Sequence, residues 1–166
     1  MRERFGTHNL GRPHFAALMV EKGLVKYRQQ AFDRYFARGR DCYVDRTGAD
    51  LAMAVRAIKN SGGIPVQAHP LSIYVGWGKL EETIKGIRDK GVMGLEAWHP
   101  GIKVGEAKRL EELAHNLGMI ATAGSDFHGE KVRADRKIGH TAGNKKIDDR
   151  FWEEELKPIL GAAKTK

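Results

Sequence analysis

The residues best suited to chemistry lie in the stretch MIATAGSDFHG, residues 119–129. Small and branched residues open this stretch, a composition typical of a short buried strand. Asp126 and His128 follow, separated by one residue, so on an extended backbone both side chains would leave the same face. A carboxylate and an imidazole presented together can bind one divalent metal ion. The alternative is a Ser/Asp turn that caps a following helix, with His128 on the surface.

Two more apolar segments end in polar side chains upstream of this stretch. The segment IPVQA leads into His69 and a proline, and the segment VMGLEAW contains Glu96 and leads into His99. A neutral imidazole at His69 can bind a metal, and His99 is placed to act as a proton donor or a hydrogen-bond donor to phosphate. Glu96 is either a partner of such ligands or a half-buried carboxylate. The alternatives are a core histidine at His69 and loop packing at His99.

The elements that position these side chains alternate regularly. Each predicted strand follows an amphipathic helix that ends at a glycine, which predicts an α/β fold with parallel strands. Because parallel strands joined by helices place their carboxyl ends at one edge, the three polar clusters are expected to converge. The predicted helices cover residues 50–60, 79–90 and 104–117, and the glycines that end them are Gly62, Gly91 and Gly118.

The N-terminal part of the chain has a different pattern from the remainder. Apolar residues at helical spacing predict two short helices over residues 14–22 and 29–38. The first opens with the sequence GRPH, where free N–H groups of a helix start beside Arg12 suit a phosphate. Arg40 could add to such a site. The alternative is a loop leading into a capped helix, with arginines that only face water.

Composition narrows the functional class. A chain of 166 residues with 41% hydrophobic residues can bury one core, so one domain is expected. A net charge of +8 favours phosphate-bearing ligands, although no basic stripe interleaved with aromatic residues indicates a dedicated nucleic-acid module. No apolar run approaches a membrane span, and the basic N-terminus lacks the apolar core of a secretory signal. The single cysteine, Cys42, suits a reducing, cytoplasmic location.

Five segments, taken in order, resemble the PHP (polymerase and histidinol phosphatase) family of metal-dependent phosphoesterases. They are GRPHFAALMVEKGLV, AFDRYFARGRDCYV, GGIPVQAHP, GLEAWHP and GSDFHG, and the similarity runs from Gly11 to about Gly139. The resemblance is greatest to the branch that acts on nucleotide phosphates and short RNA ends. It implies a partial distorted (β/α)7 barrel, made of the C-terminal strands and helices, with a small helical insertion near the N-terminus. Residues 1–166 would form a single incomplete PHP domain, with the insertion at 10–46 and barrel βα units at 48–160.

The resemblance also implies roles for particular residues. Members of the family bind up to three divalent metals, often manganese, zinc or iron, and the insertion helps to cover the substrate. The substrate would be a phosphate-ester small molecule, a nucleotide or a short oligonucleotide. The expected metal ligands are His69, Asp126 and His128, the expected catalytic residue is His99, and the expected phosphate-binding residues are Arg12, His14 and Arg40.

One departure from the family pattern limits what is expected of this chain alone. The family begins with a His-x-His strand end and further ligands on the first strands, and the segment around His8 is not that motif. The expectation is therefore a phosphoesterase domain that is weakly active or inactive without those ligands. The alternative is a non-catalytic basic module that binds phosphate-bearing ligands or self-associates through the exposed edges of a half-barrel.

Overall fold

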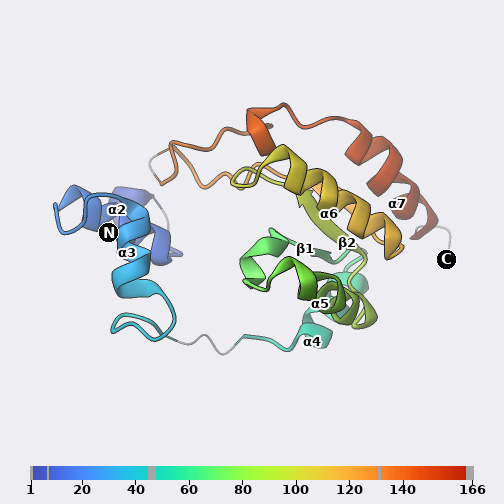
Figure 1. The fold of residues 1–166 in the computed structure, drawn as a ribbon, viewed down its shortest axis with the longest axis horizontal. Helices are drawn as coiled ribbons and strands as arrows, with labels where there is room; N and C mark the ends of the chain where they lie inside the picture. Colours follow the sequence, from blue (N-terminus) through green and yellow to red (C-terminus); the bar gives the residue numbers. More distant parts are fainter. Residues whose placement is uncertain (1, 7, 45–47, 131, 164–166) are drawn as a thin grey trace. The chain divides into compact units, whose positions relative to one another are not determined.

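A computed structural model describes residues 2–6, 8–44, 48–130 and 132–163 (Figure 1). The chain divides into two compact units. Unit 1 consists of Met1–Gly48 with His128–Asp135, and unit 2 consists of Ala49–Phe127 with Arg136–Lys166. The predicted helical segment at 10–46 falls within unit 1, and the predicted alternation of helices and strands falls within unit 2.

Unit 2 is built on a parallel sheet of order β1-β2-β3. This confirms the predicted α/β fold with parallel strands. The first strand is shorter than expected, because only Val66 and Gln67 pair with β2. Pro65 has no N–H to donate to a ladder, and the chain leaves the sheet after Gln67. The strands are β1 (Val66–Gln67), β2 (Gly94–Trp98) and β3 (Ile120–Ala123).

Helices surround the sheet, with α6 packed against β2 and β3, and η4 packed against β3 (Figure 1). The short helical turn η2 follows β1, and the short helical turn η3 precedes η4 and α7. No helix in the described ranges is long and apolar enough to cross a bilayer. The helices are α4 (Leu51–Asn60), α5 (Trp77–Asp89), α6 (Val104–Asn116) and α7 (Lys157–Ala163), and the turns are η2 (Pro70–Ile73), η3 (Ala142–Asn144) and η4 (Phe151–Leu156).

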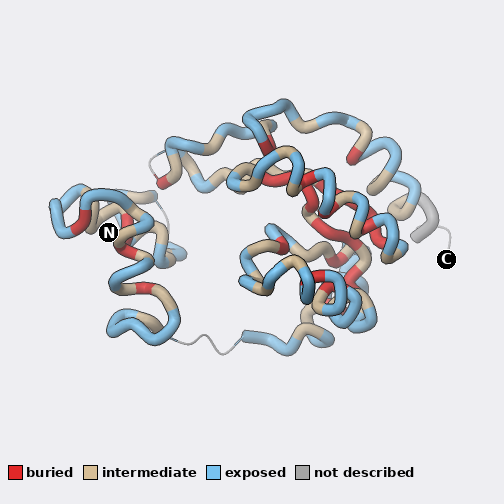
Figure 2. Tube along the Cα trace, in the orientation of Figure 1, coloured by how far each residue is buried: buried red, intermediate tan, exposed pale blue. Residues whose placement is uncertain are grey.

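The core of unit 2 lies around β2, the middle strand. Leu95 and Ala97 of this strand are fully buried, and α6 packs Leu110 on the sheet with no exposed surface. Gly94 lets the neighbouring strands approach, because a Cβ there would lie 2.8 Å from the Ile120 side chain. Figure 2 shows the buried stretches concentrated along the strands and the helix faces next to them. Since a fully buried leucine contributes about 2 kcal/mol, this packing fixes β2 and the side chains at its end.

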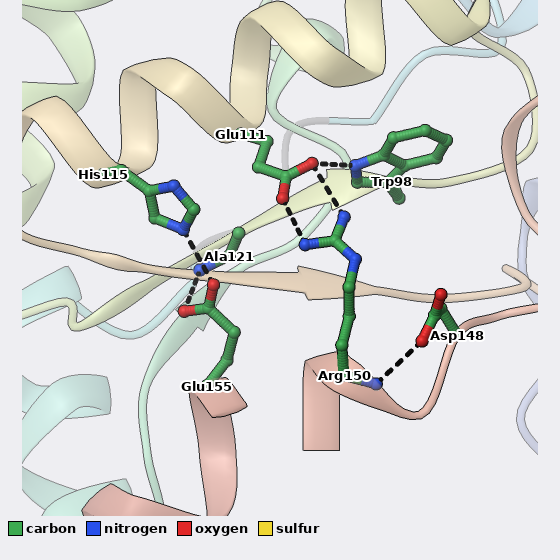
Figure 3. A network of polar contacts seen from close by, with 7 residues as sticks. All are labelled: Trp98, Glu111, His115, Ala121, Asp148, Arg150 and Glu155. Atoms are coloured by element: carbon green, nitrogen blue, oxygen red, sulfur yellow. Dashed lines mark hydrogen bonds and ion pairs between the residues drawn. The ribbon is translucent and has the colours of Figure 1, made fainter. Parts of the chain in front are cut away.

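A polar network joins α6 to the sheet and to the C-terminal segment (Figure 3). Glu111 accepts a hydrogen bond from the Trp98 indole N–H at 2.6 Å and forms an ion pair with both terminal nitrogens of Arg150, at 2.5 and 3.0 Å. Glu155 accepts from the Ala121 N–H of β3 at 3.2 Å and pairs with His115. β3 is an edge strand, with no further strand paired to it in the described sheet. The Glu155 carboxylate therefore accepts a hydrogen bond from a backbone N–H of an edge strand.

Unit 1 contains a second, smaller core. It consists of Ala16, Val25, Ala31 and Phe36. The two predicted helices are confirmed, although the second is an α-helical turn followed by a wider π-helical turn rather than one α-helix. The helices are α1 (Arg2–Phe5), α2 (Arg12–Glu21) and α3 (Arg28–Ala31), with the turn η1 (Phe32–Phe36).

The Glu111 network yields a stability prediction. The hydrogen bond from Arg150 is the main cause that holds the pKa of Glu111 below its ordinary value of 4.5, with burial acting against it. A carboxylate with a lowered pKa stabilises the fold above its unfolded pKa, and this contribution is lost as pH falls through its folded pKa. We expect Glu111→Gln to lower the unfolding free energy by about 2 kcal/mol at pH 7, the range of hydrogen bonds to charged groups. Urea unfolding from pH 7 down to pH 3 measures this, and the difference should shrink as pH falls.

The matched control is Glu112→Gln, one residue further along the same helix, where the side chain is exposed. It should change stability little. An equal loss in both variants, or a loss at Glu111 that does not vary with pH, would contradict the role given to the network.

Candidate active site

His69 stands just beyond the end of β1 in an unusual backbone conformation. Its φ of 31° lies in the left-handed region, which is uncommon for a residue with a side chain. Its backbone N–H donates to Oε2 of Glu96 at 2.7 Å, and its ring Nδ1 lies 2.7 Å from the Ser72 hydroxyl. These two contacts hold both the backbone and the ring of His69, and Nε2 is the ring nitrogen left for another partner. Strained backbone of this kind is often found at binding and catalytic sites.

His99 stands at the end of β2 and is only 8% exposed. Its Nδ1 lies 3.2 Å from the Pro100 carbonyl oxygen, which can only accept, so Nδ1 carries the proton in this contact. Its Nε2 is buried and has no hydrogen-bond partner among the described residues. Burial is the largest cause that lowers the pKa of His99, outweighing the opposing effects of the Pro100 carbonyl and Glu96. A neutral His99 therefore presents the Nε2 lone pair, an acceptor, whereas the sequence suggested a donor.

Asp126 follows β3 and completes a group of side chains at one edge of the sheet. The rings of His69 and His99 lie 6.3 Å apart, nearly perpendicular, and the charges of Glu96 and Asp126 both act on His99. The structure thus brings together His69 and His99 from two neighbouring strand ends, and the charge of Asp126, beyond the third strand, acts on the same imidazole; the roles predicted for these residues stay predictions.

The backbone at Asp126 differs from the expectation. The extended backbone assumed from the sequence ends at Ala123, and Asp126 has a left-handed φ of 46°. Spacing alone therefore does not fix the relative directions of Asp126 and His128. The structure assigns Asp126 to unit 2 and His128 to unit 1.

The donor set fits a divalent cation in kind but not in number. Imidazole nitrogens and carboxylates are suitable ligands, and the buried Nε2 of His99 offers an unused lone pair. Among the described residues, however, no group of three or more His, Cys, Asp or Glu side chains is arranged to hold a metal ion. The described strand-end side chains therefore do not form a metal site of three or more ligands by themselves, and metal binding by His69 and Asp126 stays a prediction.

Unit 1 carries a separate feature, a pocket of about 530 Å³. Cationic and aromatic side chains line it together, including Lys26, Tyr27, Arg28, Phe32, His128 and Arg133. Burial is the main cause that lowers the pKa of Arg28, and the nearby charge of Arg133 adds to the effect. Two guanidinium groups held close enough to repel each other, one of them bonded to Asp135 at 3.0 Å, form a site suited to an anion.

The three residues expected to bind phosphate lie elsewhere in unit 1. The Arg12 guanidinium donates to the Phe36 carbonyl oxygen at 3.2 Å, which ties α2 to the end of η1. His14 accepts the Gly11 N–H at 3.0 Å and so closes the start of α2. Arg40 is exposed. None of these three residues lines the pocket, and their role toward phosphate stays a prediction.

Apart from His128, sequence reasoning missed the pocket residues, because they come from distant parts of the chain, between residues 13 and 32 and at residues 133 and 135. One local signal was present: Tyr27 stands between Lys26 and Arg28, and proteins that bind single-stranded nucleic acid combine positive charge with aromatic side chains.

Comparison with known proteins gives the chain clear relatives, although no protein-family model matches it. It is 31% identical over 154 residues to a 3',5'-nucleoside bisphosphate phosphatase of Chromobacterium violaceum, covering 93% of this chain and 54% of the relative. It is also 31% identical over 117 residues to a 5'-3' exoribonuclease of Haemophilus influenzae, covering 70% of this chain and 43% of the relative. The chain thus spans about half the length of the curated relatives it matches.

Solved structures support the same relationship. An amidohydrolase from Chromobacterium violaceum with bound sulfate matches with a TM-score of 0.72 and 31% identity, over 92% of this chain and 51% of the other. A protein of Bifidobacterium adolescentis provisionally assigned as a metal-dependent phosphoesterase matches with a TM-score of 0.65 and 26% identity, over 88% and 49%. The chain therefore shares the α/β fold of these two structures and is similar in sequence to proteins named as a nucleoside bisphosphate phosphatase and an exoribonuclease.

The tautomer of His99 is directly measurable. At pH 7 we expect a neutral ring with the proton on Nδ1 and none on Nε2, because burial lowers the pKa and the Pro100 carbonyl accepts from Nδ1. Long-range ¹H–¹⁵N NMR spectra of the histidine rings distinguish the two tautomers, with the exposed His115 as an internal reference. A signal for protonated Nε2 or for an imidazolium at His99 at this pH would contradict the assignment.

Proposed function

We propose that the chain is the C-terminal part of a PHP-type, metal-dependent phosphoesterase that hydrolyses phosphate esters of nucleotides or short RNA. The observation that carries this proposal is the gathering of His69, His99 and Asp126 at one edge of a parallel sheet in a chain homologous to such enzymes. The enclosing fold would be a distorted (β/α)7 barrel, to which the described part of this chain would contribute β1, β2 and β3.

The residues at the strand ends would have different roles, metal binding for some and proton acceptance for another. His69 and Asp126 would contribute metal ligands, and His128, which the family pattern pairs with Asp126, stays a predicted ligand. A bound divalent cation, manganese, zinc or iron, would supply Lewis acidity toward a phosphoryl oxygen. His99, neutral and buried, would accept a proton or a hydrogen bond at Nε2. A reducing compartment such as the cytoplasm suits the single, exposed Cys42.

The pocket of unit 1 would bind the anionic and aromatic parts of the substrate. Arg28 and Arg133 supply donors for a phosphate group, while Tyr27 and Phe32 supply apolar surface for a base. The names of the relatives, a nucleoside bisphosphate phosphatase and an exoribonuclease, agree with a ligand that combines both parts.

Metal binding tests the strand-end site. Equilibrium dialysis against Mn²⁺ or Zn²⁺ followed by elemental analysis should detect bound metal, and His69→Gln and Asp126→Asn should each weaken binding at least about tenfold, since each removes one ligand. The matched control is His115→Gln, because His115 pairs with Glu155 near the start of β3, away from the strand ends. Equal metal content in all four proteins, or none at any metal concentration, would contradict the metal site.

Ligand binding tests the pocket of unit 1. We expect the Arg28→Gln variant to bind adenosine 5'-monophosphate about tenfold or more weakly than the wild-type chain, the loss expected for a charge-assisted hydrogen bond, with the difference decreasing at high salt. Isothermal titration calorimetry measures this, with the exposed Arg38→Gln as the control for net charge. An equal loss in both variants would mean that the pocket is not the binding site. Nucleotide binding without any metal binding would favour a non-catalytic basic module.

A further inference from the structure

Glu96 joins two neighbouring strand ends through its side chain. It lies on β2, and its Oε2 accepts the backbone N–H of His69 at 2.7 Å. His69 lies beyond Gln67, the last residue of β1 that pairs in the sheet, so the ladder between β1 and β2 does not satisfy this N–H. The Glu96 carboxylate therefore takes the place of a strand partner at this point.

The third strand end is shaped to make room for the same carboxylate. A Cβ atom at Gly124 would collide with Oε1 of Glu96. The Gly124 N–H donates to the Trp98 carbonyl oxygen at 2.8 Å, so the backbone of β3 runs close beside β2 here. The φ of Gly124 is not left-handed, so the glycine provides space for the Glu96 carboxylate rather than a special backbone conformation.

An irregularity in the sheet directs Glu96 to this position. The pairing of β2 with β3 shifts register between Glu96 and Trp98, as in a β-bulge. Such bulges re-aim side chains and are common next to active sites. Glu96 is half-buried as a result, with one oxygen bonded to the His69 amide and the other against Gly124.

We propose that Glu96 is a positioning residue for the candidate active site: its carboxylate holds the His69 backbone in the left-handed conformation and so directs the His69 imidazole toward the strand-end group. The part played by this group in catalysis rests on the proposed function, but the hydrogen bond does not. Glu96 acts by holding the His69 backbone, in the space that Gly124 leaves for its carboxylate. This role differs from that of a metal ligand and from that of a carboxylate that only faces water.

The His69 amide provides the test. In the Glu96→Ala variant, hydrogen exchange of this amide, followed by NMR on the metal-free chain, should be about tenfold or more faster, because the acceptor is lost. Glu96→Gln keeps an acceptor oxygen and should restore most of the protection. The matched control is Glu106→Ala, since Glu106 makes the same kind of bond to the Lys103 N–H at 2.8 Å on α6, and that variant should leave His69 unchanged.

The Gly124→Ala variant provides a second, independent test of the proposal. The added methyl group should displace the carboxylate, speed exchange at His69 and destabilise the chain, and the destabilisation should be smaller in a Glu96→Ala background. Unchanged exchange at His69 in Glu96→Ala or in Gly124→Ala, or no rescue by Glu96→Gln, would overturn the proposal. Failure of the wild-type chain to bind metal would overturn only the proposed function, because the amide measurement uses no metal.

Discussion

Parallel pairing of three short strands, with β2 in the middle, is the constraint on which the rest of unit 2 depends. Parallel pairing requires helical crossovers, and these place every strand end at the same edge. His69, His99 and Asp126 are about thirty residues apart from one another along the chain, yet they come to one edge because each lies shortly after the end of a strand. The buried packing of β2, with Leu95 and Ala97 enclosed, gives that edge a rigid centre.

Charge is distributed differently from what the total suggests. The chain carries a net charge of +8, but the strand-end group combines the imidazoles of His69 and His99 with the carboxylates of Glu96 and Asp126, an environment that suits a cation. The positive charge that suits a phosphate gathers in unit 1, around Arg28 and Arg133. In the proposed enzyme, the metal and the substrate would thus be bound by groups of opposite sign, each of which lies in its own segment of the chain.

The sequence predicted the framework and the residues that it brings together. Helix periodicity and the terminal glycines were sufficient, since Gly62, Gly91 and Gly118 all adopt the positive φ expected just after a helix. What could not be predicted depends on contacts between distant residues. The left-handed backbone at His69 requires the Glu96 carboxylate from another strand, and the pocket of unit 1 requires two segments about a hundred residues apart. Local patterns contain no information about such pairs.

The central claim is that a divalent cation binds where the three strands end. Paramagnetic Mn²⁺ titrated into ¹⁵N-labelled protein broadens the NMR signals of nearby residues first, and so locates the ion without any assay of activity. The account predicts early, saturable broadening at His69, Glu96, His99 and Asp126, while signals of α6 near His115 stay sharp. Broadening spread over exposed carboxylates across the surface, with the strand ends affected no earlier than the rest, would contradict it.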